Sequence, residues 1–378
     1  MSTLREAIVV IPGTRWEDTQ GTDHRLAQAL SDHCHVLWVD PPVPFAGPAQ
    51  VQRPTGIALM HLDQLQGSIT RLRYLVTPGF TRPELQLLAT ALRDRAIRTA
   101  QRRLGLATQA TLLLSPRDQF PAKSTGQRWL HVTDDWVQGA AMMGLNRQDV
   151  QRRLVRNLAE TDHLSAVSPY LEKVLLELDP GHDVQVLPNG CTVLHTEAVR
   201  PKPAIPSKVV LLGQLNERLD LQILDYLATS GLTIEVIGPR REQEKNVKEC
   251  LDRFLAAQNV HWHGEVAPNE VPALIQDAAV GITPYLDNDF NRASFPLKTL
   301  DYLAAGLAVV STDSPAVRWL DTPNVQIAQG PRHFVQLVAQ LAENPGTQEE
   351  RQQRINFANG HSWQMRAASL MDRLKVQV

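Results

Sequence analysis

The stretch FPLKTLDYLAAGLAVVST, residues 295–312, is typical of a short helix that leads directly into a buried strand. Pro296 suits the first turn of a helix, where its missing N–H removes no hydrogen bond. The run LAVVST that follows is short, apolar and rich in valine, as expected of a strand covered on both faces. The stretch therefore predicts one helix–strand unit of a parallel α/β sheet.

The same alternation of apolar runs and helix-period segments extends along the whole chain. We expect strands at 6–12, 35–40, 110–115, 128–133, 162–168, 208–213, 232–238, 259–264, 278–285, 307–312 and 324–328. We expect helices at 22–30, 83–104, 147–160, 219–228, 296–305 and 333–343. This order is typical of parallel sheets with helices on both faces.

A proline-rich segment, VRPKPAIPSK, separates two such series. Proline makes a linker semi-rigid, so the sequence predicts two doubly wound, Rossmann-like α/β domains. They would span 1–190 and 207–360, joined by a linker at 191–206, with a helix at 361–378 crossing back to the first domain. Because ligands bind beyond the carboxyl ends of parallel strands, we expect the two domains to face a common cleft.

Net charge and cysteine content limit which partners and which cellular location we expect for the protein. A net charge of −2 spread over 378 residues argues against nucleic acid as a partner. Cys34, Cys191 and Cys250 are far apart in the sequence, which favours reduced thiols in the cytoplasm over a disulfide framework. No signal peptide or membrane-spanning segment is apparent, so we expect a soluble cytoplasmic protein.

Lys298 and Asp301 lie on the opening turns of the helix predicted at 296–305. The first turn of a helix offers unpaired N–H groups and a partial positive charge, which together attract anions. Lys298 adds a full charge there, and Asp301 follows one turn later. This arrangement suits a nucleoside diphosphate whose ribose is held by the carboxylate. A surface helix with a solvated lysine and aspartate produces the same pattern.

The segment PLKTLDYLAAGLAVVST resembles the donor-binding segment of GT-B glycosyltransferases, particularly the large retaining family 4. That family usually shows P-x-K-x-x-E-Y-L-A-A-G-x-P-V-V. Similar segments occur here in the family's order: ETDHLSAVSPYL, VLPNGCTV, VVLLGQLNERLDLQIL, IEVIGPR and HGEVAPNEVPALIQDAAVGITPY.

The resemblance implies transfer of a sugar from a nucleotide sugar, with uridine as the default base, to a hydroxyl acceptor. It implies a role in the synthesis of cell-surface polysaccharide, glycolipid or natural-product glycan, without a catalytic metal or cofactor. By the same resemblance Asp301 would hold the ribose, while Lys298 and Gly213 would lie at the diphosphate. The full implied donor set is Gly213, Arg218, Pro284, Tyr285, Ser294, Phe295, Pro296, Leu297, Lys298 and Asp301.

The sequence departs from the family's pattern at two places. Ala293 stands where the family has a glutamate that touches the donor sugar, and Asp287 or Asp289 could replace it. Arg218 stands near the family's phosphate-binding lysine. It could neutralise the leaving diphosphate or simply pair with Asp220. These departures leave open both the sugar and the choice between retention and inversion.

Candidate acceptor-side residues follow strands of the first domain. Asp134 and Asp135 follow the strand at 128–133, and one of them could act as the general base of an inverting transfer. Asp135 aligns better, although one of the pair could instead cap the following helix. We also expect Arg15, Trp16 and Arg117, in loops after two other strands, on the acceptor side.

The helix at 83–104 carries five arginines: Arg93, Arg95, Arg98, Arg102 and Arg103. A basic amphipathic helix can rest on anionic lipid and meet a lipid-linked acceptor at the inner face of the plasma membrane. A solvated arginine-rich face is the alternative.

Two other functions stay open at this stage. The first is a sugar-nucleotide epimerase of the same fold, which needs a carboxylate and histidine pair at the sugar. The second is a degenerate protein that binds nucleotide or glycan without turnover, as the absence of glutamate at Ala293 allows.

Overall fold

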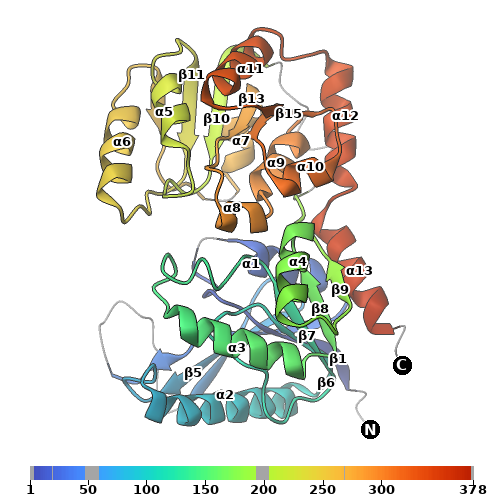
Figure 1. The fold of residues 1–378 in the computed structure, drawn as a ribbon. Helices are drawn as coiled ribbons and strands as arrows, with labels where there is room; N and C mark the ends of the chain where they lie inside the picture. Colours follow the sequence, from blue (N-terminus) through green and yellow to red (C-terminus); the bar gives the residue numbers. More distant parts are fainter. Residues whose placement is uncertain (1–3, 19, 47–58, 193–203, 268, 376–378) are drawn as a thin grey trace. The chain divides into compact units, whose positions relative to one another are not determined.

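The computed structural model describes residues 4–18, 20–46, 59–192, 204–267 and 269–375, which form two compact units (Figure 1). The first unit comprises the described parts of 1–167, 171–187 and 366–378, and the second those of 168–170 and 188–365. The last helix therefore begins in the second unit and continues in the first. The predicted linker at 191–206 falls mostly outside the described residues, so its course stays a prediction.

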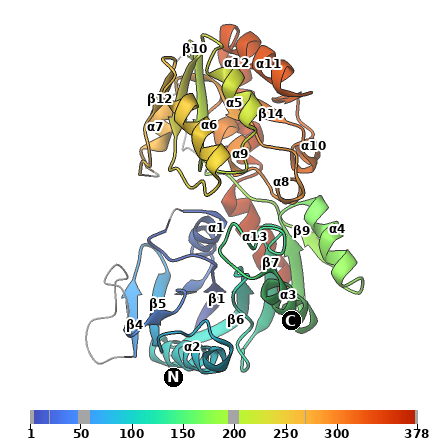
Figure 2. The same cartoon turned by 60° about the vertical axis from the view of Figure 1, so that its left-hand side comes forward.

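The first unit is built on a mostly parallel sheet (Figure 2). Its strands lie in the order β3-β5-β2-β1-β6-β7-β8-β9, and β4 pairs antiparallel with β5. Their bounds are β1 Arg5–Ile11, β2 His35–Val39, β3 Val43–Pro44, β4 Met60–Gln64, β5 Ile69–Val76, β6 Leu106–Leu113, β7 Gln127–Val132, β8 His163–Ala166 and β9 Val184–Val186.

Four of these strands, β3, β4, β5 and β9, were not predicted from the sequence. In β5 the run ITRLRYLV places Arg71 and Arg73 among its apolar residues, so no continuous apolar run marks the strand. Arg71 is nevertheless buried, because its guanidinium pairs with the buried carboxylate of Asp40. The strand was missed because Arg71 is buried through an ion pair with a residue far away in the sequence, which the local pattern does not show.

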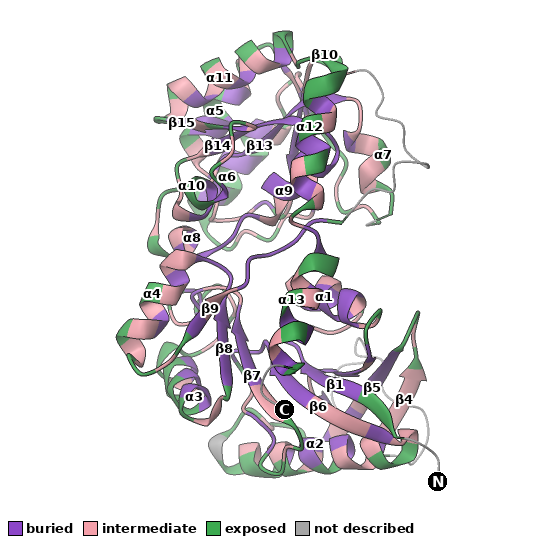
Figure 3. Ribbon diagram, turned by 90° about the vertical axis from the view of Figure 1, so that its right-hand side faces the viewer, coloured by how far each residue is buried: buried purple, intermediate pink, exposed green. Residues whose placement is uncertain are grey.

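The second unit contains a fully parallel sheet within the described chain, in the order β12-β11-β10-β13-β14-β15. Its strands are β10 Ile205–Leu212, β11 Thr233–Ile237, β12 Val260–Trp262, β13 Ala278–Thr283, β14 Ala308–Thr312 and β15 Val325–Ala328. The central strands are buried in both units, whereas the helices expose their outer faces (Figure 3). The prediction of an α/β fold with Rossmann-like parallel sheets is confirmed.

The predicted helices lie close to their expected positions. The helices of the first unit are α1 Thr22–Leu30, α2 Pro83–Leu104, α3 Arg147–Glu160 and most of α4 Pro169–Leu178 and α13 Trp363–Lys375. Those of the second are α5 Leu221–Leu227, α6 Lys245–Leu255, α7 Val271–Ile275, α8 Asp289–Ala293, α9 Leu297–Ala304, α10 Pro315–Leu320, α11 Pro331–Glu343 and α12 Gln348–Asn359. Of these helices, α4, α6, α7, α8, α10 and α12 were not predicted. No helix in the described ranges is both long and apolar enough to cross a membrane.

Tyr302 fixes α9 against the sheet of the second unit. A Cβ at Gly281 would lie 2.2 Å from the Tyr302 ring, so this position on β13 accepts only glycine. The Leu212 N–H donates to the Tyr302 hydroxyl at 2.6 Å, and the hydroxyl donates to the Ile282 carbonyl at 3.2 Å. The helix is thereby held across the carboxyl ends of β10 and β13, where a Rossmann-like sheet binds ligands.

Two buried arginines of α12 support the opposite end of α9. Arg351 donates to the carbonyls of Gln276 and Ala305, at 2.9 and 3.4 Å. Arg354 donates to the Gly306 carbonyl at 3.2 Å. The last carbonyls of a helix have no partner inside the helix, and a cation also suits their partial negative charge.

Candidate functional site

The start of α9 has the features of an anion site. Pro296 is the N-cap, and its side chain offers no acceptor to the first backbone N–H groups of the helix. Lys298 Nζ lies 3.1 Å from Asp301 Oδ2, and both side chains are mostly buried. The residues predicted for the diphosphate and the ribose are therefore neighbours on one helix.

Gly213 lies beside Lys298 at the end of β10. Its φ of 135° favours glycine, and a Cβ built there would lie 3.9 Å from Lys298 Cγ. Gly238, which follows β11, has a φ of 142°, and its Cβ would lie 1.9 Å from the Gly213 carbonyl oxygen. Two strand ends thus approach each other through glycine backbone, next to the lysine.

Arg218 is held between two aromatic rings. Its guanidinium carbon lies 5.1 Å from the ring centroids of both Tyr285 and Phe290, and its Nε donates to Asn291 Oδ1 at 2.8 Å. The proposed pairing with Asp220 is not found among the described residues: Asp220 instead caps α5, accepting from the N–H groups of Gln222 and Ile223. The guanidinium is therefore fixed without a carboxylate partner in the described chain, as suits a group that binds a phosphate.

Two buried side chains hold the backbone that precedes α9. Ser168 Oγ donates to the Ala293 carbonyl at 2.6 Å, and Asn189 Nδ2 donates to the Phe295 carbonyl at 3.2 Å. Ser168 and Asn189 belong to the SPY and PNG segments that the sequence analysis quoted without a role. A buried carbonyl needs a donor, so these residues set the path of the chain into the anion site.

An open pocket, a hollow of about 340 Å³ when the adjoining open solvent is included, lies beside this helix start. Arg218, Tyr285, Ser294 and Pro296, all predicted for the donor, line it. Asp287, predicted as a possible replacement for the missing glutamate, lines it too. Residues that were not predicted for the donor also line it, and these are Leu286, Asn291, Arg292, Ser311, Thr312, Asp313 and Ser314. The signal for the last four was a polar STDS run that includes the last two residues of β14. Pro284, Phe295, Leu297, Lys298, Gly213 and Asp301 are not among its lining residues.

Two aspartates, Asp134 and Asp135, follow β7 in the first unit. Asp135 Oδ1 accepts from the N–H groups of Val137 and Gln138, at 3.1 and 3.0 Å. Asp135 thus caps a turn, whereas the capping alternative predicted from the sequence was a helix cap. Which of the two aspartates acts as a base stays a prediction.

Asp23, at the start of α1, is a buried carboxylate that sequence reasoning missed. Its Oδ2 accepts from the Gly13 N–H at 2.8 Å, just after β1. Burial raises the pKa of Asp23 to about 6, and the charge of Asp134 contributes to the increase. A polar residue in a first helical turn has an ordinary capping role, so nothing in the sequence distinguished it.

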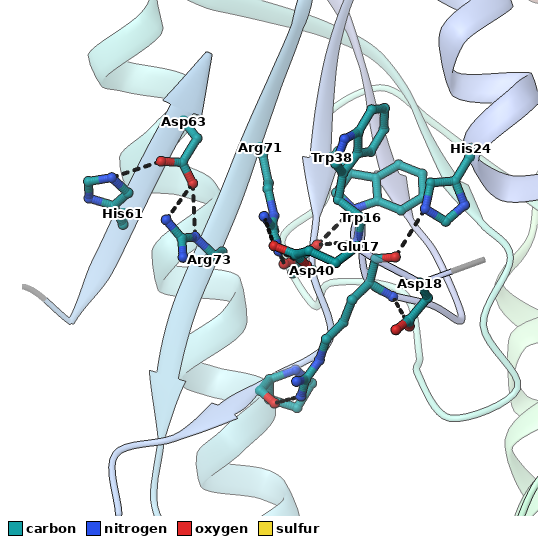
Figure 4. Close-up of polar contacts among 12 residues, drawn as sticks. Trp16, Glu17, Asp18, His24, Trp38, Asp40, His61, Asp63, Arg71 and Arg73 are labelled. Carbon is teal, nitrogen blue, oxygen red and sulfur yellow. Dashed lines mark hydrogen bonds and ion pairs between the residues drawn. The ribbon is translucent and has the colours of Figure 1, made fainter. Parts of the chain in front are cut away.

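Arg15 and Trp16 belong to the loop after β1, which is tied down at several points (Figure 4). The Trp16 ring packs against Trp38 and His24, with centroids 5.0 and 5.3 Å away. The Arg15 carbonyl accepts from His24 Nε2 at 3.0 Å, and burial lowers the pKa of His24. These contacts with the core of the unit hold the loop in place. They do not test the predicted role of Arg15 and Trp16 in acceptor binding.

Glu17 extends this network to the neighbouring strand. Arg71 donates from Nη2 to Glu17 Oε2 at 2.6 Å and from Nε to Asp40 Oδ2 at 2.8 Å (Figure 4). The Arg71 hydrogen bond lowers the pKa of Glu17 against the opposing effect of burial. One buried arginine thus joins the loop to β2 and β5.

Two other predicted arginines have structural partners in this unit. Arg117 donates from Nη2 to the Met143 carbonyl at 3.1 Å. Arg93 is 2% exposed and pairs with Asp94 and Asp118, each at 3.0 Å. Including Arg93 in an exposed basic face was therefore wrong, whereas Arg95, Arg102 and Arg103 are exposed.

The comparison with known families agrees with this geometry. Residues 208–344, which carry the anion site and the pocket, match the family model described as Glycosyl transferases group 1. The chain is a glycosyltransferase with the GT-B fold.

Single relatives of this glycosyltransferase align with nearly its whole length. It is 25% identical to a protein of Bacillus subtilis strain 168 whose name assigns it to teichuronic acid biosynthesis as the glycosyltransferase TuaH, over 99% of this chain and 98% of the other. Sucrose-phosphate synthase from Thermosynechococcus elongatus superposes with a TM-score of 0.70 at 14% identity, covering 99% of both chains. Anabaena HepE, solved with UDP and glucose, gives a TM-score of 0.64 at 13% identity, covering 97% of this chain and 99% of that one.

Proposed function

We propose that this glycosyltransferase takes its sugar from a nucleoside diphosphate sugar, with a UDP-sugar favoured, and transfers it to a hydroxyl of a cell-surface polysaccharide or glycolipid precursor. The observation that supports donor binding is the start of α9, where Pro296 supplies no side-chain cap and Lys298 and Asp301 lie on the first turns. The polysaccharide context is supported by the name of the Bacillus subtilis relative, and uridine by the ligand named for HepE.

In this proposal the second unit stabilises the leaving group. The bond between the sugar C1 and the β-phosphate oxygen breaks, and its electron pair stays on the nucleoside diphosphate. Arg218, Lys298 and the N–H groups at the start of α9 offset the charge that develops there, without a metal. A new bond forms between C1 and the acceptor oxygen. For an inverting transfer, Asp134 or Asp135 takes the acceptor proton.

Donor binding is tested first by thermal shift with UDP, GDP and dTDP, with and without magnesium. At about 100 times its dissociation constant, a ligand stabilises the folded state by about 2.7 kcal/mol, roughly 5–10 °C for a unit of this size. We expect one base to produce this shift, independently of magnesium, and Lys298→Ala to abolish it. Lys245→Ala, which alters an exposed lysine of α6, is the matched control.

The outcomes separate the alternatives. A shift that Lys298→Ala leaves unchanged would remove Lys298 from the site, and the absence of any shift would contradict the proposed donor. Binding without sugar transfer or hydrolysis by the wild type would favour a degenerate binding protein.

We further propose that α2 brings the enzyme to anionic membrane surfaces, where lipid-linked acceptors lie. Leu87 is 80% and Leu88 45% exposed on the helix that also exposes Arg95, Arg102 and Arg103. Near an anionic surface each basic residue contributes about 1 kcal/mol, so replacing all three by glutamine should weaken binding to phosphatidylglycerol vesicles roughly a hundredfold.

Co-sedimentation at low and high salt measures this binding. The control replaces Arg152 and Arg156 of α3, which already pair with Asp149 and Glu160. A wild-type protein that stays in the supernatant at low salt would contradict membrane contact.

A further inference from the structure

Asp287 and Arg292 form a rigid ion pair on the wall of the pocket in the second unit. Arg292 donates from Nε to Asp287 Oδ1 at 2.7 Å and from Nη2 to Oδ2 at 2.9 Å. Such a two-pronged pair fixes the plane of both groups. Both side chains line the pocket that Arg218 also lines.

The other polar groups of the pocket are mostly committed to holding its walls. Asn291 accepts from Arg218 and donates to the carbonyls of Arg218 and Leu286. Thr312 Oγ1 donates to the Tyr285 carbonyl at 2.8 Å, and Ser311 Oγ to the Thr312 carbonyl at 2.8 Å. Ser314 Oγ accepts from the Val317 N–H as the cap of α10. These groups shape the cavity and have limited capacity left for a ligand.

The pair, in contrast, keeps hydrogen-bonding capacity towards the pocket. Its side chains are 64% and 43% exposed, so the carboxylate lone pairs that Arg292 does not use stay accessible. Hydrogen bonding to Arg292 lowers the pKa of Asp287, which keeps the carboxylate ionised. Asp313 also lines the pocket, but its partner Arg318 does not. Asp287 and Arg292 thus place acceptors and donors side by side, and Asp289, whose Oδ1 lies 3.5 Å from Arg292 Nη1, gives the cluster a net negative charge that disfavours an anionic sugar.

Adjacent acceptors and donors match the hydroxyl groups of a sugar, each of which both donates and accepts. A lone arginine would instead favour an anionic group. We propose that the Asp287–Arg292 pair binds hydroxyls of the donor sugar and selects a neutral hexose, with Asp287 supplying the carboxylate that position 293 lacks. This rests on the proposed function, because it requires the diphosphate to lie at Arg218 in the same pocket.

Calorimetry on the full chain tests the pair by comparing UDP with UDP-glucose, UDP-N-acetylglucosamine and UDP-glucuronate. If another base gives the thermal shift, the corresponding GDP or dTDP compounds replace them. In Asp287→Asn and Arg292→Gln, we expect the affinity for the preferred neutral sugar nucleotide to fall about tenfold relative to the affinity for UDP. Binding of UDP itself should change less than twofold, which also reports that the variants are folded.

The matched control is Asp225→Asn, which breaks the exposed pair with Arg253 on other helices of the unit. Unchanged ratios in both pocket variants, with UDP still bound, would overturn the inference while leaving the proposed function intact. A wild-type preference for UDP-glucuronate would overturn the selection of a neutral hexose. If no nucleoside diphosphate binds at all, the proposed function fails, and the inference fails with it.

Discussion

Replacing Arg218 by alanine should lower the rate of sugar transfer by a factor of about 10² to 10³, while the protein stays folded. Removing one fixed donor that stabilises charge in a transition state typically costs this much, about 2.7–4 kcal/mol. Arg218 is suited to that role because Tyr285, Phe290 and Asn291 hold its guanidinium in place before any ligand arrives. The measurement is release of nucleoside diphosphate from the sugar nucleotide that the binding experiments identify.

The comparison variants separate charge from packing. Arg218→Lys keeps the charge but loses the Nε bond to Asn291, so we expect an intermediate rate. Arg332→Ala is the matched control, since its guanidinium also lies over an aromatic ring, 5.9 Å from the Tyr226 centroid, but outside the pocket. A normal rate in Arg218→Ala would mean that the leaving diphosphate is stabilised elsewhere.

Replacing Arg351 by alanine should destabilise the second unit by about 3–5 kcal/mol. The guanidinium is 2% exposed and donates to three carbonyls, those of Gln276, Ala278 and Ala305. Its loss leaves buried acceptors without a donor and opens a cavity, and each effect costs a few kcal/mol. The melting temperature should fall by roughly 10 °C.

Two further variants locate the cause of that loss. Arg351→Met keeps most of the volume without the donors, so a similar loss of stability would assign the effect to the hydrogen bonds. Gln353→Ala, which changes an exposed side chain of the same helix, should leave the melting temperature within about 1 °C, because surface substitutions typically have small effects. A fall of only 1–2 °C in Arg351→Ala would show that water replaces the guanidinium at these carbonyls.

The fold was largely predictable because its signals are local. The central strands are continuous apolar runs and the helices are bounded by prolines, glycines and capping residues, so both appear in windows of ten or so residues. Where a strand owes its burial to a distant partner, as β5 does through Arg71 and Asp40, the local signal was absent.

The candidate site also contains some features that local sequence predicts and others that it does not. Lys298 and Asp301 could be assigned from the sequence, because helix geometry alone places them on one turn. Asp135 and Asp220 could not be resolved, since a carboxylate after a strand or before a helix serves equally as a cap or as a reactive group. The structure shows the cap in both cases.

By itself, then, the sequence determined the order of most strands and helices and placed Lys298 and Asp301 on the first turns of α9, because these features depend on residues close together along the chain. Only the tertiary structure decided which side chains share a pocket. Arg218 lies 73 residues from Asn291, and Asn189 lies 106 residues from the Phe295 carbonyl that it holds. Contacts over such separations depend on how the strands are ordered in the sheet, and that order arises from packing the whole core at once.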